Sequence, residues 1–486
     1  MLKARLLEFH RWLGALALFA GLLAGTGPAP AAGLPALLSD ADEARIGAEQ
    51  HQEILAEFGG AYEDPKLAAY VDSIGQFLAL TSERPNLKFT FTVLDSPIVN
   101  AFATPGGYVY VSRGLLALAG DEAEVAGVIA HEIGHVAARH GVQRIEGGML
   151  ANLGLGLLGL LTKNEQIAGL AQYGALAVLQ GYSREQEYEA DLLGVRYLSR
   201  AGFDPEAMAS FLNKMKASSE LDAIESGGSD GERLDLMSTH PRTAERVHRA
   251  IAAAGARKVS NPIVGRDIYL TKIDGILYGD DPAQGLVRDR RFIHPALRFA
   301  FDAPADFALL NGETQVIGRG PQGALMVFDG AAREGGRAMA RYIGEVWLTK
   351  AAPAAEPIRI DGRDAATAAF RGSVQGQPTD VRAVAIAFDS RTVYRFLFLT
   401  PPAVTDQFDE SFRRTAYSFR SISAAEAQSA RPRRMVLHRV ADGETSAQVA
   451  RLMAVDKNPL ERFLILNGLY PNQPLVPGSV VKVVVE

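Results

Sequence analysis

The chain has 486 residues, a formal net charge of −6 and no cysteine. This length allows several domains, and a hydrophobic content of 48% is ordinary for a globular protein. The mild acidity and the lack of a basic stripe argue against nucleic acid as a partner. The absence of cysteine excludes disulfides and thiolate ligands, so a bound metal ion would need nitrogen and oxygen donors.

The first residues have the pattern of an export signal. Lys3, Arg5 and Arg11 precede an apolar stretch at residues 12–24, and the small residues 29–31 are typical of a cleavage site. We therefore expect residues 1–31 to be a signal peptide and the protein to be periplasmic. The apolar stretch is shorter than the ~20 residues of a spanning helix, and an uncleaved membrane anchor is the alternative.

Three short segments after the signal predict a small sheet. Residues 89–94 alternate at period two, and a Pro-Gly-Gly turn separates residues 100–104 from residues 108–111. An edge strand here can pair with the backbone of an extended peptide. The candidate substrate-binding residues are Asn100, Ala101 and Phe102. The alternative is that these strands only cover the neighbouring helix.

The sequence HEIGH at residues 131–135 is the most informative motif in the chain. Positions i and i+4 of a helix share one face, so His131 and His135 can bind one metal ion while Glu132 faces its open side. This is the geometry of a zinc hydrolase. Residues 121–124 predict an N-terminal cap, and Gly141 predicts the end of the helix just after His140, which we interpret as a C-terminal histidine of that helix.

A polar cluster at residues 182–191 offers the third ligand that a catalytic zinc ion needs. Glu185, Glu187 and Glu189 compete for this role. Glu187 is preferred because Asp191 lies one helical turn beyond it, where it can accept the outer N–H of a ligating imidazole. The alternative is that Glu187 and Asp191 flank Arg184 in a surface ion-pair array.

A pair of histidines on one helix followed by Glu-x-x-x-Asp on another resembles the gluzincin metallopeptidases grouped with the CAAX prenyl protease and BepA, in their soluble periplasmic branch. Similar stretches occur in the same order over roughly 150 residues. They are residues 100–111, residues 183–191, and residues 238–241 with Arg246. The resemblance implies that His131, His135 and Glu187 bind one zinc ion and that Glu132 is the general base.

The resemblance also implies a role for His240, and two roles stay open. His240 can be a catalytic residue that stabilises the oxyanion, or it can occupy the open zinc position and hold the enzyme inactive. The Gly/Ser-rich loop at residues 226–231 would permit such movement. The remaining alternative is an ordinary capping histidine before Pro241.

Two uncharged Gly/Ala/Leu-rich runs, residues 147–162 and 167–183, separate the two metal-binding segments. Each is short for a membrane span, so we expect a buried or groove-lining helical hairpin. Transient membrane contact is the alternative, because integral members of the resembled family carry spanning helices in this region.

Beyond about residue 255 the pattern predicts an α+β module of unknown function. The expected strands are residues 267–277, 297–301, 384–388 and 393–399, and the expected helices are residues 334–346 and 406–417. In the last segment, the stretches at residues 440–445, 463–469 and 475–485 resemble a LysM module, a small βααβ fold in families that bind N-acetylglucosamine polymers. Peptidoglycan is therefore a candidate partner, and the alternative is a module that only packs on its neighbour.

These features predict an α+β protein: a mainly helical zincin-type protease domain with a small β-sheet, an α+β module and a LysM-like βααβ module. The expected boundaries are 38–258, 263–425 and 433–486. The expected function is a zinc metalloendopeptidase of the cell envelope that hydrolyses unfolded or misassembled exported proteins. The alternative function is a non-catalytic envelope chaperone or peptidoglycan-associated adaptor.

Overall fold

The computed structural model describes residues 38–146, 181–225, 240, 244–253, 259–312, 314–333, 336–351, 353–374 and 376–486. The predicted signal peptide, the loop at residues 226–231 and residues 147–180 of the apolar runs lie outside this part, as do Ser238, Thr239 and Pro241. The described residues divide into two compact units, 38–281 with 432–486, and 282–431. The predicted α+β class is confirmed.

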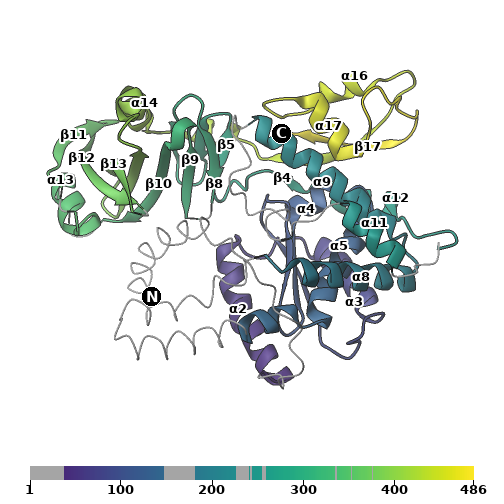
Figure 1. Ribbon diagram of the computed structural model, residues 1–486. Coiled ribbons are helices and arrows are strands. Elements are labelled where there is room, and N and C mark those ends of the chain that lie inside the picture. The colour runs from purple at the N-terminus through teal and green to yellow at the C-terminus, as the bar shows by residue number, and fades with distance from the viewer. Residues whose placement is uncertain are drawn as a thin grey trace. The chain divides into compact units, whose positions relative to one another are not determined.

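The first unit surrounds a three-stranded sheet with helices (Figure 1). Its strand order is β1-β3-β2, with β1 parallel and β2 antiparallel to β3. The strands are β1 (Thr90–Leu94), β2 (Ala101–Thr104) and β3 (Tyr108–Ser112). The helices are α2 (Asp40–Glu57), α3 (Pro65–Ala79), α4 (Arg113–Leu118), α5 (Glu122–Ala137), α8 (Arg184–Ala201), α9 (Glu206–Glu225), α11 (Ala244–Ala253) and α12 (Arg266–Ile273). The three predicted strands are confirmed, and β2 lies at a sheet edge as expected.

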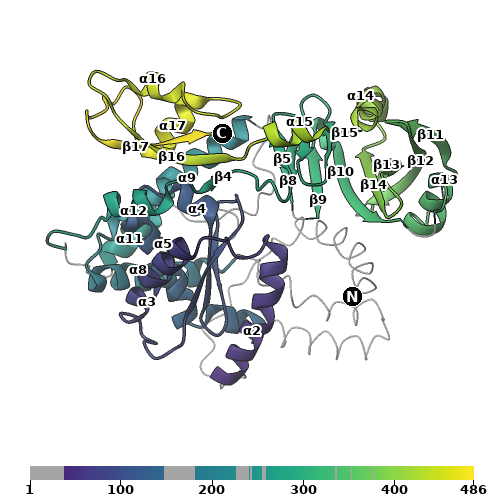
Figure 2. The ribbon, with the colours of Figure 1, turned by 180° about the vertical axis from the view of Figure 1, so that it is seen from behind.

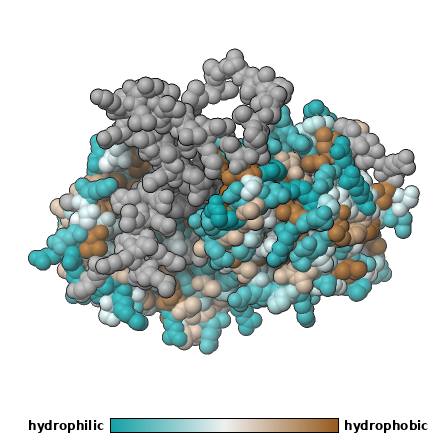
Figure 3. Space-filling view, turned by 90° about the horizontal axis from the view of Figure 1, so that it is seen from below, coloured by the Kyte–Doolittle hydropathy of each residue, from teal (hydrophilic) through white to brown (hydrophobic). Residues whose placement is uncertain are grey.

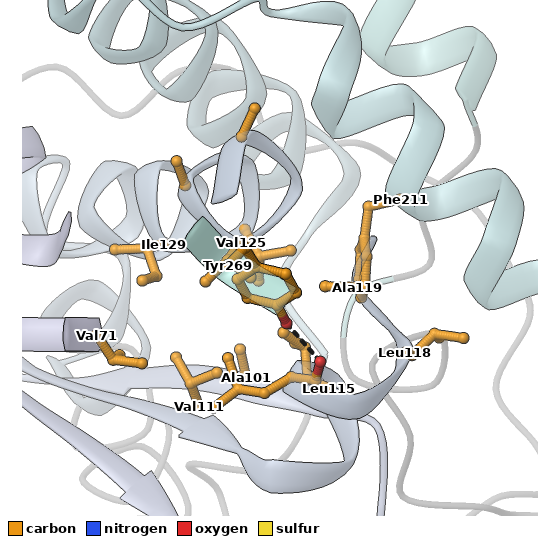
Figure 4. Close-up of a cluster of buried hydrophobic side chains, with 14 of the residues drawn as sticks. Val71, Ala101, Val111, Leu115, Leu118, Ala119, Val125, Ile129, Phe211 and Tyr269 are labelled. Atoms are coloured by element: carbon orange, nitrogen blue, oxygen red, sulfur yellow. Dashed lines mark hydrogen bonds between the residues drawn. The ribbon is translucent and has the colours of Figure 1, made fainter. Parts of the chain in front are cut away.

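Helix α5 runs through the centre of this unit and is buried along almost its whole length. One face packs on the core that Figure 4 shows, where Val125 and Ile129 lie near Tyr269, whose hydroxyl donates a hydrogen bond to the Leu116 carbonyl. The opposite contact is a close crossing with α8. A Cβ atom on Gly134 would lie 2.9 Å from the Ala190 carbonyl oxygen, so only glycine permits this approach.

The last 55 residues complete the first unit instead of forming a separate body. Strands β4 (Leu277–Tyr278), β16 (Arg433–Arg439) and β17 (Val480–Val485) form a sheet in the order β17-β16-β4, and α16 (Ser446–Ala450) and α17 (Pro459–Asn467) lie between β16 and β17 in the chain (Figure 2). This is the expected βααβ order. Met435, Phe463 and Val483 belong to the same hydrophobic core as α5. The module is thus packed firmly on its neighbour.

Lys482 of β17 is the most deeply placed charged residue of this module. It is 0% exposed, and its Nζ donates to the carbonyl oxygens of Ala117, Leu118 and Ala119 at 2.8, 3.0 and 2.7 Å. These are the last carbonyls of α4, which have no partner within that helix. A cation from the end of the chain therefore caps the helix that leads into α5.

The second unit contains a seven-stranded antiparallel sheet in the order β11-β12-β13-β14-β10-β9-β8 and a four-stranded sheet in the order β15-β7-β6-β5. Its strands are β5 (Leu286–Arg288), β6 (Arg291–His294), β7 (Phe299–Asp302), β8 (Ala308–Asn311), β9 (Gln315–Arg319), β10 (Leu325–Ala332), β11 (Glu356–Ile360), β12 (Arg363–Val374), β13 (Gln377–Ala387), β14 (Thr392–Thr400) and β15 (Arg420–Ser421). Its α-helices are α13 (Met339–Tyr342), α14 (Thr405–Ser418) and α15 (Ala424–Ser429). Aromatic side chains dominate its core, and Phe412 of α14 stacks on Phe398 of β14 at 4.5 Å between ring centroids.

One predicted element is wrong. Residues 267–277 were expected as a strand, but most of them form α12 and only Leu277 belongs to β4. Tyr269, Leu270 and Ile273 recur at helical spacing and are all buried, and this 3.6-residue period outweighs the β-propensity of the same residues. The predicted strands at 297–301, 384–388 and 393–399 and the helix at 406–417 are confirmed. In the predicted helix at 334–346, the described residues 336–346 contain the short helix α13, which is followed by a π-helical turn at Ile343–Trp347.

Among the described residues, no helix has both the length and the apolarity needed to cross a bilayer. The face in Figure 3 mixes hydrophilic side chains with small, scattered hydrophobic ones.

Candidate metal centre

The HEIGH motif lies in the second half of α5, as the sequence predicts. The helix begins where expected, because the Asp121 side chain accepts a hydrogen bond from the Glu124 amide at 2.9 Å. Glu124 is itself buried and accepts from Lys214 of α9 at 2.8 Å. Burial alone would raise the pKa of Glu124, but the Lys214 ammonium outweighs it and the pKa is lowered. This ion pair fixes the start of the helix that carries the motif.

Four buried side chains bring candidate ligand atoms within 4.8 Å of one another: His131, His135, Glu187 and His240. The two Nε2 atoms of the histidine pair are 2.9 Å apart. The Oε2 atom of Glu187 lies 3.7 Å from the Nε2 of His131, and its Oε1 atom lies 3.4 Å from the Nε2 of His135. Ligands of a tetrahedral zinc ion are separated by roughly 3.4 Å, given Zn–N and Zn–O distances near 2.1 Å. The three separations bracket this value, so the donor set fits one zinc ion.

Glu187 and Asp191 project from the first two turns of α8, where a capping box between Ser183 and Gln186 starts the helix. Asp191 lies 2.8 Å from the Nδ1 of His131. Arg246 of α11 donates to both carboxylates, at 3.1 Å to Glu187 and 2.5 Å to Asp191. Glu187 and Asp191 therefore form a buried network around the histidines and not a surface ion-pair array.

The charge state of the cluster suits a cation. Burial lowers the pKa of His135 well below its usual value, which keeps the imidazole neutral with a free lone pair. Burial alone would raise the pKa of Glu187, but the imidazoles of His240, His135 and His131 outweigh it and lower the pKa. A neutral imidazole beside an ionised carboxylate is the form in which both bind metal.

Comparison with known proteins agrees with this geometry. Residues 65–254 match the model of Peptidase family M48. Over these residues the chain is similar to peptidase family M48. The predicted gluzincin resemblance is thus confirmed for residues 65–254, which contain the HEIGH motif. The family implies zinc as the metal.

Two proteins that are similar to this chain show how far the similarity extends. The beta-barrel assembly-enhancing protease of Yersinia pestis is 32% identical over 228 residues, which cover 45% of each chain. The mitochondrial metalloendopeptidase OMA1 of Schizosaccharomyces pombe is 31% identical over 213 residues, which cover 43% of this chain and 59% of the relative. The chain therefore spans only about half of the length of these relatives.

His240 lies inside the cluster of candidate metal ligands. Its Nδ1 is 2.7 Å from Glu187, and its Nε2 is 3.9 Å from Glu132. It is only 1% exposed, so it is not a capping histidine at a surface helix end. This position is compatible with both roles implied by the family resemblance.

Two residues that contact the candidate metal ligands were not predicted correctly: Tyr182 was missed and His140 was misplaced. Tyr182 stacks on His135 with ring centroids 3.9 Å apart, and burial raises the pKa of Tyr182 to about 12. His140 was expected at the C-terminus of the motif helix, but α5 ends at Ala137. Arg139 then adopts a left-handed φ of 59°, and a new helical segment starts at His140, which is buried against His135. A helix stop at Gly141 is therefore wrong, because the reversal occurs two residues earlier.

Of the expected substrate-binding residues, Ala101 and Phe102 lie on β2, at one edge of the sheet, and Asn100 immediately precedes this strand. Ala101 packs in the core around α5, whereas Phe102 faces the other side of the sheet and stacks on Tyr110 at 4.9 Å. The end of β2 lines a small cavity that Thr104 shares with His135. The strand can thus offer its backbone near the metal-binding residues, but the Phe102 side chain does not point toward them.

Proposed function

We propose that this chain is a zinc metalloendopeptidase of the cell envelope that hydrolyses peptide bonds in unfolded or misassembled polypeptides. The observation that carries the proposal is the convergence of His131, His135 and Glu187 on one point, with His240 in the same cluster and Glu132 3.9 Å from the Nε2 of His240. All four side chains are buried, and donors with no role would be costly to bury together.

The residues divide the work of peptide hydrolysis. A bound zinc ion would polarise the scissile carbonyl and lower the pKa of a water molecule toward roughly 7. Glu132 accepts the proton from the attacking water and passes it to the departing amine. His240 either donates a hydrogen bond to the oxyanion or blocks the open ligand position, and both roles stay in the proposal.

Peptide recognition would use the backbone of β2. An extended substrate pairs with an edge strand through main-chain hydrogen bonds, which are available in any sequence. This mode favours unfolded chains over a particular motif. The name of the bacterial relative, a beta-barrel assembly-enhancing protease, connects that protein with beta-barrel assembly and supports polypeptides that fail to assemble as the proposed substrates. The export-signal pattern of residues 1–31 is the basis for the proposed periplasmic location.

Removal of the metal tests the proposal. Treatment with a zinc chelator is expected to abolish cleavage of a reduced, carboxymethylated model protein, and addition of one equivalent of zinc is expected to restore it. Cleavage is followed by gel electrophoresis, and zinc is counted by elemental mass spectrometry. Undiminished cleavage by zinc-free protein would overturn the proposal. Tight binding of the unfolded protein without any cleavage would instead favour the non-catalytic chaperone.

A second candidate function concerns the C-terminal module, for which we infer a wall-binding surface. Tyr470 and Val476, in the connection between α17 and β17, are 78% and 68% exposed, whereas Met435, Phe463 and Val483 of the same module are buried in the core. An exposed aromatic ring, in a connection that also carries an exposed apolar side chain, is a suitable platform for a sugar ring. The LysM resemblance stays a prediction, and this exposed connection is what supports it.

Co-sedimentation with purified peptidoglycan checks this surface. Tyr470→Ala is expected to lower the bound fraction roughly two- to tenfold, the loss associated with one aromatic contact. Tyr417→Ala, which removes an exposed tyrosine from α14 in the other unit, is the matched control and should bind like wild type. Equal sedimentation of all three proteins would reject wall binding. Substitution is preferable to deletion of residues 433–486, because deletion would strip Met435, Phe463 and Val483 from the shared core.

A further inference from the structure

His140 contacts the back of one candidate metal ligand. Its Nδ1 lies 2.9 Å from the Nδ1 of His135, and its Nε2 lies 3.3 Å from a carboxylate oxygen of Glu189. His140 is 0% exposed, whereas the Glu189 side chain is 60% exposed. A row of three polar groups therefore leads from the metal-binding face of His135 to solvent.

The protons along this row can be assigned without conflict. The Nε2 of His135 faces the other ligands, so it must offer a lone pair and the ring proton must sit on Nδ1. That N–H donates to the Nδ1 of His140, which must then be unprotonated. The proton of His140 consequently lies on its Nε2 and points to the Glu189 carboxylate. Every donor in the row meets an acceptor.

The backbone explains why a histidine five residues after His135 can reach its ring. On an unbroken helix, the side chains of residues i and i+5 are about 140° apart around the helix axis, so they point to different faces. Here α5 ends at Ala137, and the left-handed Arg139 turns the chain back. Arg139 is held in place by Glu43 of α2, at 2.6 Å. The turn thus places the His140 ring beneath His135, while Tyr182 covers the face of the His135 ring.

The two candidate histidine ligands therefore have different supports. His131 has the Asp191 carboxylate 2.8 Å from its Nδ1, and Arg246 holds that carboxylate. His135 has a neutral imidazole in the same position, with the carboxylate of Glu189 one ring further out. Such outer hydrogen bonds fix the tautomer and orientation of a ligating imidazole and raise its basicity. We propose that His140, oriented by Glu189, is a positioning residue that holds His135 with its Nε2 toward the metal.

This inference rests on the proposed metal site, and zinc affinity tests it separately from proteolysis. The zinc dissociation constant of full-length protein is measured by competition with a chromophoric chelator. His140→Leu, which keeps the bulk but removes the acceptor, is expected to bind zinc about 10- to 100-fold more weakly. His140→Asn, whose side-chain oxygen can occupy the place of Nδ1, is expected to recover most of that loss.

The rescue separates positioning from packing. If leucine and asparagine weaken zinc binding equally, His140 acts only as a space-filling residue and the inference fails. It also fails if His140→Leu binds zinc as tightly as wild type. The visible spectrum of the cobalt-substituted protein gives a second measurement, because a turned His135 ring would change the ligand field in the leucine variant but not in the asparagine variant. A wild-type protein that binds zinc but cuts no substrate would defeat the proposed function and leave this comparison intact.

Discussion

Replacement of Glu132 by Gln is expected to lower the rate of cleavage of an unfolded protein by a factor of roughly 10²–10⁴, the usual contribution of a general base. Glutamine keeps the size and shape of the side chain but cannot accept a proton at neutral pH. Since the proposed zinc ligands are His131, His135 and Glu187, the variant should still hold one zinc ion. Initial rates and zinc content, measured on the same preparation, check both statements.

A matched control comes from the third-ligand helix. Glu185 lies on the first turn of α8 and is exposed, so Glu185→Gln removes the same charge without touching the cluster. It should cut and bind zinc like wild type. If Glu132→Gln cuts as fast as wild type, Glu132 has no role as a base. If the variant loses its zinc, Glu132 supports the metal and its effect on the rate cannot be assigned to proton transfer.

The sequence predicts which side chains cluster in the candidate site, because helical periodicity decides most of their placement. His131 and His135 are four residues apart on one helix, as are Glu187 and Asp191 on another. Local geometry alone therefore puts each pair on one face. The sequence could not say how the two helices meet. That depends on Gly134 and Gly194, which let α5 and α8 approach until a Cβ atom would clash.

The residues that contact the candidate ligands could not be predicted, for a different reason. His140 reaches His135 only because Arg139 adopts a left-handed conformation, which is uncommon for a residue with a side chain. Tyr182 lies in an irregular segment before α8, so no periodicity marks its stacking on His135. Arg246 was visible only as part of a family motif, and its two hydrogen bonds to carboxylates depend on the packing of α11. Contacts made through turns and tertiary packing carry no short-range signal.

The C-terminal module shows the same limit at larger scale. Its βααβ order could be predicted, but the pattern gave no sign that the module shares a core with the motif helix. Besides Lys482, Arg462 of α17 ties the module to the first unit, donating to Asp222 and Glu225 of α9 at 2.6 and 2.8 Å. Arg266 of α12 also joins the Gly120 carbonyl to that of Val480. The end of the chain thus braces the segment that leads into α5.

Lys482→Met is therefore expected to destabilise the first unit by roughly 2–5 kcal/mol. The substitution leaves the carbonyls of Ala117, Leu118 and Ala119 in a dry interior without their donor, at a cost of about 1–3 kcal/mol for each buried unsatisfied group. Part of this cost is offset, because burial lowers the pKa of Lys482 well below its usual range and methionine removes the penalty of burying that charge.

Calorimetry of the full chain measures the effect, and the transition of the first unit should move down by about 5–15 °C. Lys457→Met is the matched control, since Lys457 is an exposed lysine of the same module that donates one hydrogen bond to the Glu225 carbonyl at 3.0 Å. Its transition should stay within about 1 °C of wild type, as for most surface substitutions. Because the three carbonyls lie immediately before the N-cap of α5, the Lys482 variant should also lose zinc to a chelator at a lower temperature than the control. If both variants melt like wild type, the C-terminal strand is not a structural part of the metal-binding unit.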